Sequence, residues 1–99
     1  MSRGPDVATQ LARAIEASRP GEVVLARESR PWASVTFSGA RHRLTLDAGA
    51  APGLDAWLSA LPEREIPLRG HLVADVAVAS TEQREDGARV VIEVLTVEE

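Results

Sequence analysis

The sequence predicts an α+β fold in which two helix-plus-hairpin units form a mainly antiparallel sheet with two helices packed on one face. Apolar residues recur at helical spacing in two segments, each helical segment is followed by strand-like runs, and Gly- and Pro-containing turns separate the elements. A chain of 99 residues can bury one core between two layers. We therefore expect a single α+β domain over residues 1–99.

The composition excludes several classes of protein. Hydrophobic residues make up 44% of the chain and charged residues 26%, which is close to the average of globular proteins. No apolar run approaches the roughly 20 residues that a membrane helix needs. The chain starts with an amphipathic stretch instead of the apolar core of a signal peptide. We expect a cytoplasmic protein without a membrane partner.

Missing residue types narrow the chemistry further. The chain has no cysteine, which excludes disulfides, thiol nucleophiles and thiolate metal sites. Lysine, tyrosine and asparagine are also absent, whereas Ala, Arg, Gly and Pro are plentiful, which indicates a GC-rich and bacterial genome. The formal net charge of -4 disfavours general binding to polyanions.

The first unit begins with an amphipathic helix over residues 6–18. Its apolar face carries Val7, Leu11, Ala14 and Ile15. The Pro-Gly pair at positions 20 and 21 predicts its end, and a short strand is expected over residues 22–27.

Alternation over residues 32–47 then predicts a hairpin. A two-residue turn at Gly39 and Ala40 places Phe37 opposite His42, and Trp32 opposite Asp47. In this register His42, Leu44 and Leu46 face the core, as does Phe37, whereas Trp32 faces away from it.

The second unit repeats this order. Leu54, Trp57, Leu58 and Leu61 define a short helix that Pro62 stops, and residues 66–68 are expected to form a short strand. Residues 71–97 form the clearest hairpin, in which a three-residue turn over 85–87 pairs Arg84 with Ala88. Its outer face carries Val73, Asp75 and Ala77, and its inner face carries Leu72, Ala74, Val76, Val78, Val90, Ile92 and Val94. The two units suggest an internal pseudo-repeat over residues 6–48 and 53–98.

The main functional hypothesis concerns the sheet face that the helices leave uncovered. In the predicted register this face carries apolar side chains where a solvated face would be polar. The expected interface residues are Val73, Val91, Leu95, Val97 and Trp32. We expect a non-enzymatic interaction domain that forms a homodimer through this face or through a free edge of the strand over residues 90–97, with another protein as the alternative partner.

Two further functions remain open. A small-molecule-binding domain or small enzyme would place a pocket between sheet and helices, and a single-stranded nucleic acid would need a basic strand with an aromatic side chain. The candidate contacts for either ligand are Arg41, Arg43, His42 and Asp75. Histidine and serine spacings match no metal or nucleophile motif, so no catalytic, cofactor or metal residue is assigned.

Overall fold

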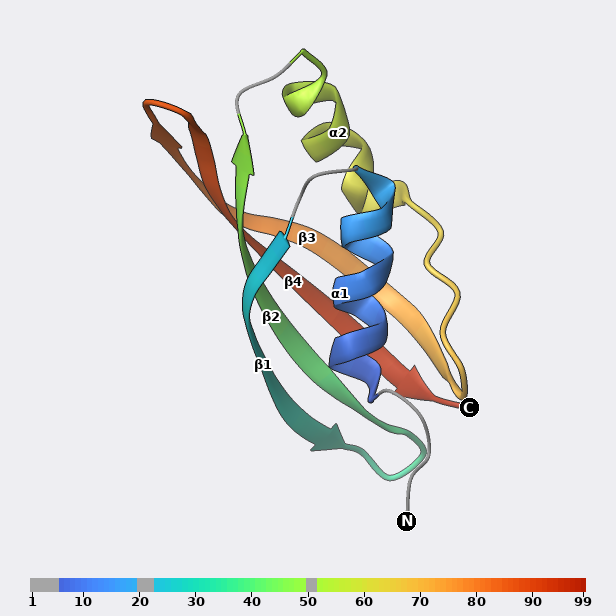
Figure 1. Cartoon of the computed structure of the whole chain (residues 1–99). Coiled ribbons are helices and arrows are strands. Elements are labelled where there is room, and N and C mark those ends of the chain that lie inside the picture. The colour runs from blue at the N-terminus through green and yellow to red at the C-terminus, as the bar shows by residue number, and fades with distance from the viewer. Residues whose placement is uncertain (1–5, 20–22, 50–51) are drawn as a thin grey trace.

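The structure, a computed structural model, describes residues 6–19, 23–49 and 52–99. It has an α+β fold with the element order α-β-β-α-β-β (Figure 1). The elements are α1 (Val7–Ser18), β1 (Val23–Ala33), β2 (Ser38–Gly49), α2 (Leu54–Ala60), the short 3-10 helix η1 (Leu61–Glu63), β3 (His71–Arg84) and β4 (Gly87–Glu98).

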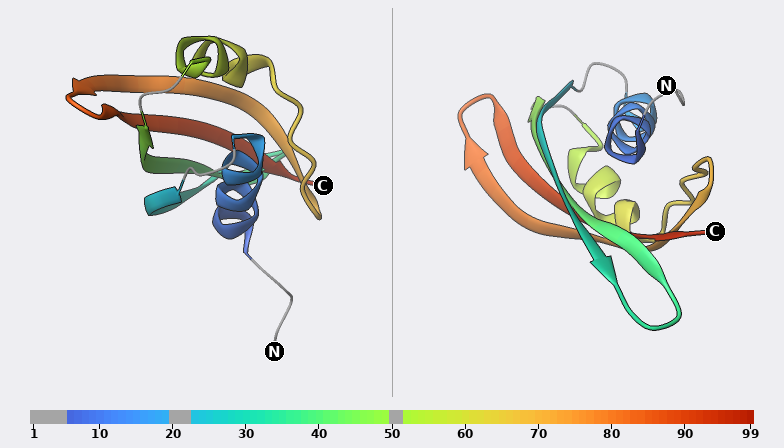
Figure 2. Two further views of the ribbon diagram at one scale, coloured as in Figure 1. Left: turned by 45° about the horizontal axis from the view of Figure 1, so that its top comes forward. Right: turned by 90° about the horizontal axis from the view of Figure 1, so that it is seen from below.

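The four strands form one antiparallel sheet in the order β1-β2-β4-β3. Both helices lie on the same face of this sheet, which curves around them (Figures 1 and 2). The predicted fold class and the placement of the helices are confirmed. Each predicted unit contributes one hairpin, and the hairpins join through their second strands, whereas an origin by duplication stays a prediction.

Helix α1 packs against the sheet as its apolar spacing predicts. Asp6 caps the helix, because its carboxylate accepts a hydrogen bond from the Thr9 backbone N–H over 2.8 Å. Leu11 and Ile15 are buried, whereas Val7 and Ala14 pack against the edge of the core. The predicted stop at positions 20 and 21 lies outside the described residues, as does the predicted strand start at position 22.

Helix α2 continues directly into η1 and buries Trp57 and Leu61. The strand expected over residues 66–68 does not form, and this segment is irregular in the structure. Pro67 has no N–H to donate to a strand ladder, yet Ile66 is still buried in the core. Among the described residues, no helix is long and apolar enough to cross a membrane.

The core lies between the helices and the inner sides of the strands. On β2, His42, Leu44 and Leu46 face this core, as predicted. The buried hydrophobic cluster comprises Leu11, Ile15, Leu44, Leu46, Ala48, Trp57, Leu61, Ile66, Val76, Ala88, Val90, Ile92 and Val94.

The predicted register of the first hairpin is wrong. Strand β1 runs on to Ala33, and the turn lies at residues 34–37, where the Ser34 hydroxyl accepts a hydrogen bond from the Phe37 N–H over 3.0 Å. Trp32 therefore pairs with Gly39 and not with Asp47. Phe37, expected in the core, is exposed at the tip of the hairpin.

The C-terminal hairpin also differs in detail. Its turn has two residues, Glu85 and Asp86, so that Arg84 pairs with Gly87 and not with Ala88. The ladder between β3 and β4 then shifts its register twice, between Val73 and Asp75 and between Val78 and Ser80. Each shift inserts one residue into β3, which reverses the alternation of side chains beyond it.

The bulge between Val73 and Asp75 makes two predictions from the sequence wrong. Val73 was expected on the uncovered face, but it pairs with the buried Thr96 and packs against the core. Leu72 was expected to face the core, but it pairs with Val97 and is 58% exposed. Between the bulges, Val76 and Val78 face the core as predicted.

Candidate interaction surface

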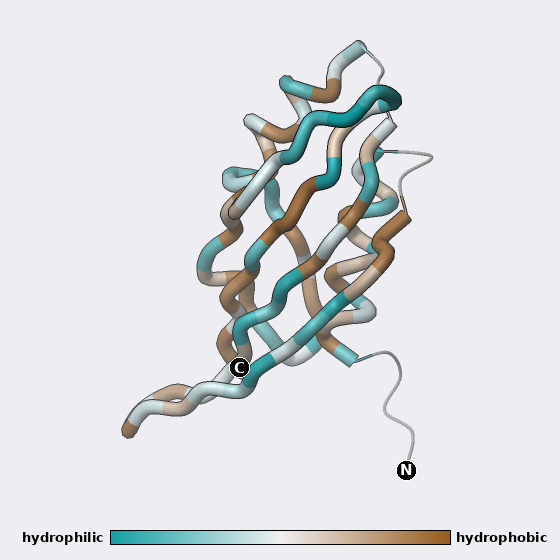
Figure 3. The backbone as a smooth tube through the Cα atoms, turned by 90° about the vertical axis from the view of Figure 1, so that its left-hand side faces the viewer, coloured by the Kyte–Doolittle hydropathy of each residue, from teal (hydrophilic) through white to brown (hydrophobic). Residues whose placement is uncertain are grey.

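The sheet has one face that no described helix covers. Figure 3 views the molecule from this side, with the strands in front and polar and apolar residues mixed along them. We call it the open face. Because side chains alternate along each strand, the open face carries the residues between the buried ones on β2 and β4.

Strand pairing arranges the open face into rows that run across the sheet from β1 through β2 and β4 to β3. Five rows follow from the registers of the three ladders. In order they are Trp32–Gly39–Val97–Leu72, Arg30–Arg41–Leu95–Asp75, Glu28–Arg43–Glu93–Ala77, Ala26–Thr45–Val91–Ser80 and Val23–Asp47–Arg89–Glu82.

Most of the predicted interface residues lie together on this face. Trp32 and Val97 share the first row, Leu95 is in the second and Val91 in the fourth. Each of the four is partly buried by its neighbours. Val73 lies on the other side of the sheet, and Leu72 takes its place at the β3 end of the first row.

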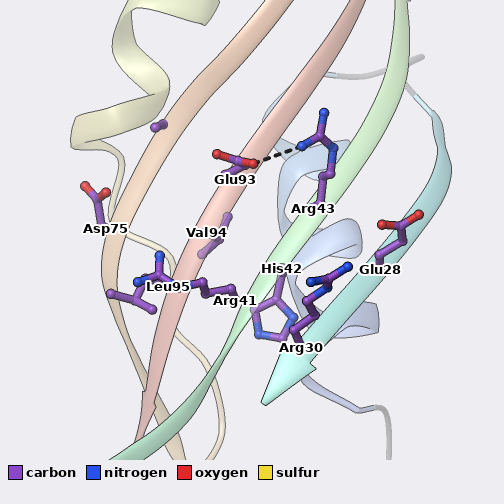
Figure 4. Close-up of a pocket in the computed structure, with 10 residues that line it drawn as sticks. Glu28, Arg30, Arg41, His42, Arg43, Asp75, Glu93, Val94 and Leu95 are labelled. Carbon is purple, nitrogen blue, oxygen red and sulfur yellow. Dashed lines mark hydrogen bonds and ion pairs between the residues drawn. The ribbon is translucent and has the colours of Figure 1, made fainter. Parts of the chain in front are cut away.

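Two ion pairs on the open face join the central strands β2 and β4. Arg43 Nη1 lies 3.1 Å from Glu93 Oε2 (Figure 4). Arg89 donates two hydrogen bonds to the Asp47 carboxylate, over 2.7 and 3.0 Å. These hydrogen bonds hold the pKa of Asp47 below its usual value. The central charges are therefore already matched within the chain.

The charges of the second row are not matched in this way. Arg30 and Arg41 lie in the second row with Asp75 at its far end, and all three side chains are exposed. Within the described part of the chain, none of the three forms an ion pair. Positive charge thus remains on the β1 side of this row and negative charge on the β3 side.

These charges surround a shallow hollow of about 510 Å³. The sequence-predicted contacts Arg41, Arg43, His42 and Asp75 all line it, together with Leu95 (Figure 4). Figure 4 shows the Arg41 side chain extended across β4 toward the side of β3. This hollow lies on the open face and not between the sheet and the helices, where the sequence analysis expected a ligand pocket.

His42 has a structural environment. It is 3% exposed, with Nδ1 2.8 Å from the Ser29 hydroxyl and Nε2 3.0 Å from the Thr96 hydroxyl. The Thr96 hydroxyl donates a hydrogen bond to the Ala40 carbonyl oxygen, so it accepts one from the Nε2–H of His42. Nδ1 then carries no proton and accepts a hydrogen bond from the Ser29 hydroxyl. Burial lowers the pKa of His42, which keeps the ring neutral.

Ser29 is the residue of this group that the sequence does not reveal. It lies 13 positions from His42, and only the pairing of β1 with β2 brings the two together. A serine beside a histidine could act as a nucleophile if a third group stabilised the imidazolium. Here the third group is the neutral Thr96 hydroxyl, so the arrangement is typical of a structural chain of hydrogen bonds.

His71 also has a structural partner at the start of β3. Its Nδ1 lies 3.1 Å from the Arg69 carbonyl oxygen. Over the ranges 6–19, 23–49 and 52–99, no three His, Asp or Glu side chains gather closely enough to hold a metal ion.

The edges of the sheet are irregular. Strand β4 is paired on both sides, so the predicted free edge at residues 90–97 does not exist. The edge strands are β1, which contains Pro31 and a bulge between Val24 and Ala26, and β3, which contains two bulges. Proline and bulges disfavour the addition of another strand.

Comparisons with known proteins add no family to this description. No family model, curated protein or solved structure matches the chain.

Proposed function

We propose that this chain is an interaction domain that self-associates through the open face of its sheet. The observation that carries the proposal is the mixture on that face: apolar side chains lie in the first, second and fourth rows, and ion-paired charges lie in the third and fifth. Apolar side chains beside matched polar groups are typical of protein interfaces.

The residues at one end of the face offer the apolar part of this interface. Trp32, Val97 and Leu72 lie across the first row, and Leu95 adjoins them in the second. The Trp32 Nε1 atom is buried and has no hydrogen-bond partner among the described residues. Aromatic and aliphatic side chains of this kind dominate binding energies when a partner removes them from water.

The irregular edges favour the face over edge pairing. A dimer formed by adding strands would need a flat edge with free N–H and C=O groups, which Pro31 and the bulges interrupt. Two faces can instead pack without breaking any ladder.

The mass in solution tests the proposal. Light scattering across the micromolar range should give twice the mass of one chain for the wild type. Leu95→Glu combined with Val97→Lys should give a folded monomer, because the new charges would be buried in the interface. As the matched control, Val35→Glu alters a fully exposed residue at the hairpin tip and should leave the mass unchanged. A wild type that is monomeric throughout this range would reject self-association.

The hollow supports a second candidate function. Arg30 and Arg41 lie beside the apolar Leu95 in a hollow of about 510 Å³, an arrangement that suits a small anion with an apolar part. A ligand that binds the native state raises its melting temperature, so thermal shifts with a panel of carboxylate and phosphate metabolites test this function. Arg41→Ala should remove any such shift.

Single-stranded nucleic acid is the weaker candidate. Trp32 and Arg41 lie on the same face, but Arg43 is paired with Glu93, and Glu28 and Asp75 line the same hollow. Acidic groups among the basic ones oppose binding to phosphates. Salt-dependent binding that Arg41→Ala with Arg43→Ala abolishes would revive this function.

A further inference from the structure

The charges on the open face form a pattern that a second copy of the chain would complement. In a face-to-face dimer with two-fold symmetry, the symmetry axis lies between the two sheets and parallel to them. An axis that runs along the strands between β2 and β4 places β1 of one copy over β3 of the other, and β2 over β4. Every row then faces the same row of the partner.

This superposition brings opposite charges together in three of the rows. In the second row Arg30 faces Asp75 of the other copy, and in the third row Arg43 faces Glu93. In the fifth row Asp47 faces Arg89. The Arg43–Glu93 and Asp47–Arg89 pairs of each chain thereby become four-charge groups. Arg30 and Asp75, which form no ion pair within the described part of the chain, gain one.

The apolar residues match in the same superposition. Trp32 faces Leu72, and Gly39, which has no side chain, faces Val97. In the fourth row Thr45 faces Val91. Facing sheets lie about 10 Å apart, a gap that an extended arginine can cross to reach a carboxylate.

An axis across the strands gives a poorer match. If it passes through the third row, it places Arg43 over Arg43, Glu93 over Glu93 and Glu28 over Glu28. Like charges opposed in an interface destabilise it. Moving this axis to the fourth row avoids the repulsion but leaves Trp32 and Leu72 outside the overlap.

The size of the face also fits a dimer. Four strands and five rows cover about 20 Å by about 33 Å, or about 650 Å² on each copy. The total of about 1,300 Å² lies within the range of specific protein interfaces.

We infer that a second copy of the chain packs on the open face around a two-fold axis parallel to the strands, so that Arg30 of each copy pairs with Asp75 of the other. This inference rests on the proposed self-association and adds its symmetry and its partner residues. It also gives a role to Arg30 and Asp75, which have opposite charges, lie on the two edge strands and form no ion pair within the described part of the chain.

Charge reversal tests the inference. Arg30→Glu alone and Asp75→Arg alone each create two like-charge contacts per dimer, so each should weaken self-association by at least about tenfold. When the two variants are mixed, one chain supplies Glu at position 30 and the other Arg at position 75, while the native Arg30 and Asp75 form the second contact. The mixture should form a heterodimer with close to wild-type affinity, and the double variant should form a homodimer again.

A matched charge reversal controls for net charge. Arg13→Glu changes an exposed residue on α1, on the opposite side of the sheet, and should leave the affinity unchanged. If the wild type is a dimer but the mixed variants stay monomeric, the inferred axis is wrong and self-association through the face survives. If the wild type is monomeric, the proposed function itself fails.

Discussion

His42 donates a hydrogen bond from Nε2 to the Thr96 hydroxyl over 3.0 Å, joining β2 to β4 inside the core. Thr96 is fully buried, and its hydroxyl donates a hydrogen bond to the Ala40 carbonyl oxygen. Because Ser29 donates to Nδ1 from β1, the imidazole links three strands as a neutral ring. A second proton on the ring would break the hydrogen bond from Ser29 and place a charge among apolar groups.

The stability of the fold should therefore depend on pH through His42. Its pKa in the folded state lies below the ordinary value of 6.5, mainly through burial, with His71 lowering it further and Asp6 opposing the shift. The unfolded chain thus binds the proton more readily than the folded chain. The free energy of unfolding should be highest above about pH 6.5 and should decrease as the pH falls through the folded-state pKa.

Chemical denaturation at pH 8 and pH 5.5 measures this dependence. His42→Gln should abolish most of the decrease and should also lower the stability at pH 8, because glutamine fits the two hydroxyl partners less well. His71→Gln is the matched control and should retain the decrease. Equal pH dependence in the wild type and His42→Gln would show that the proton binds elsewhere.

Gly39 should tolerate no side chain. A Cβ atom at this position would overlap the Thr96 carbonyl oxygen, which belongs to the backbone of β4 and cannot rotate away. Gly39→Ala should therefore push β2 from β4 at this end of the sheet and destabilise the fold by about 1–3 kcal/mol. Thermal unfolding should show a melting temperature lower by several degrees.

Gly49 provides the control for this prediction. No atom lies within 4 Å of a Cβ placed at Gly49, at the other end of β2. Gly49→Ala should be neutral or slightly stabilising, because alanine restricts the unfolded chain. Equal effects of the two substitutions would contradict the proposed close contact at Gly39.

Asp6 should contribute to stability as the cap of α1. Asp6→Ala removes the acceptor of the Thr9 N–H and should cost about 1 kcal/mol. Asp6→Asn keeps a capping oxygen and should restore most of this stability, which thermal unfolding can compare directly. If asparagine and alanine destabilise equally, the carboxylate charge matters more than the hydrogen bond.

The elements themselves could be predicted because their patterns are local. The helical spacing of Leu11 and Ile15 and the alternation of His42, Leu44 and Leu46 identify their inner faces without knowledge of any partner. The first hairpin turn could not be predicted, because the sequence offers two candidate turns, one at residues 34–37 and one at Gly39 and Ala40. Gly39 looks like a turn glycine in sequence, but it is needed where β2 closely approaches β4, a contact between residues far apart in the chain.

The open face was predictable only between the bulges. Alternation places Asp75 and Ala77 correctly, but one inserted residue after Val73 exchanges the roles of Val73 and Leu72. Apolar residues occupy both positions, so the sequence contains no contrast that reveals the shift. The row structure of the charges depends on three ladders at once, which is why the relation of Arg30 to Asp75 appears only in the folded chain.

The contact between the two helices offers a last prediction. Trp57 Nε1 donates a hydrogen bond to the Ser18 hydroxyl over 2.8 Å. The same hydroxyl donates a hydrogen bond to the Ile15 carbonyl oxygen at the end of α1. Ser18→Ala leaves the nearly buried indole N–H without this acceptor and should cost about 1–3 kcal/mol. In Trp57→Phe the donor is absent, so the further substitution Ser18→Ala should cost less than it does alone.

A double-mutant cycle isolates this contact. The difference between the two costs should be about 0.5–3 kcal/mol, measured by chemical denaturation of the wild type, the two single variants and the double variant. Additive effects would mean that the hydrogen bond contributes nothing and that packing alone joins α1 to α2. Because the test concerns the face of the sheet opposite to the proposed interface, all four chains should retain the same mass in solution.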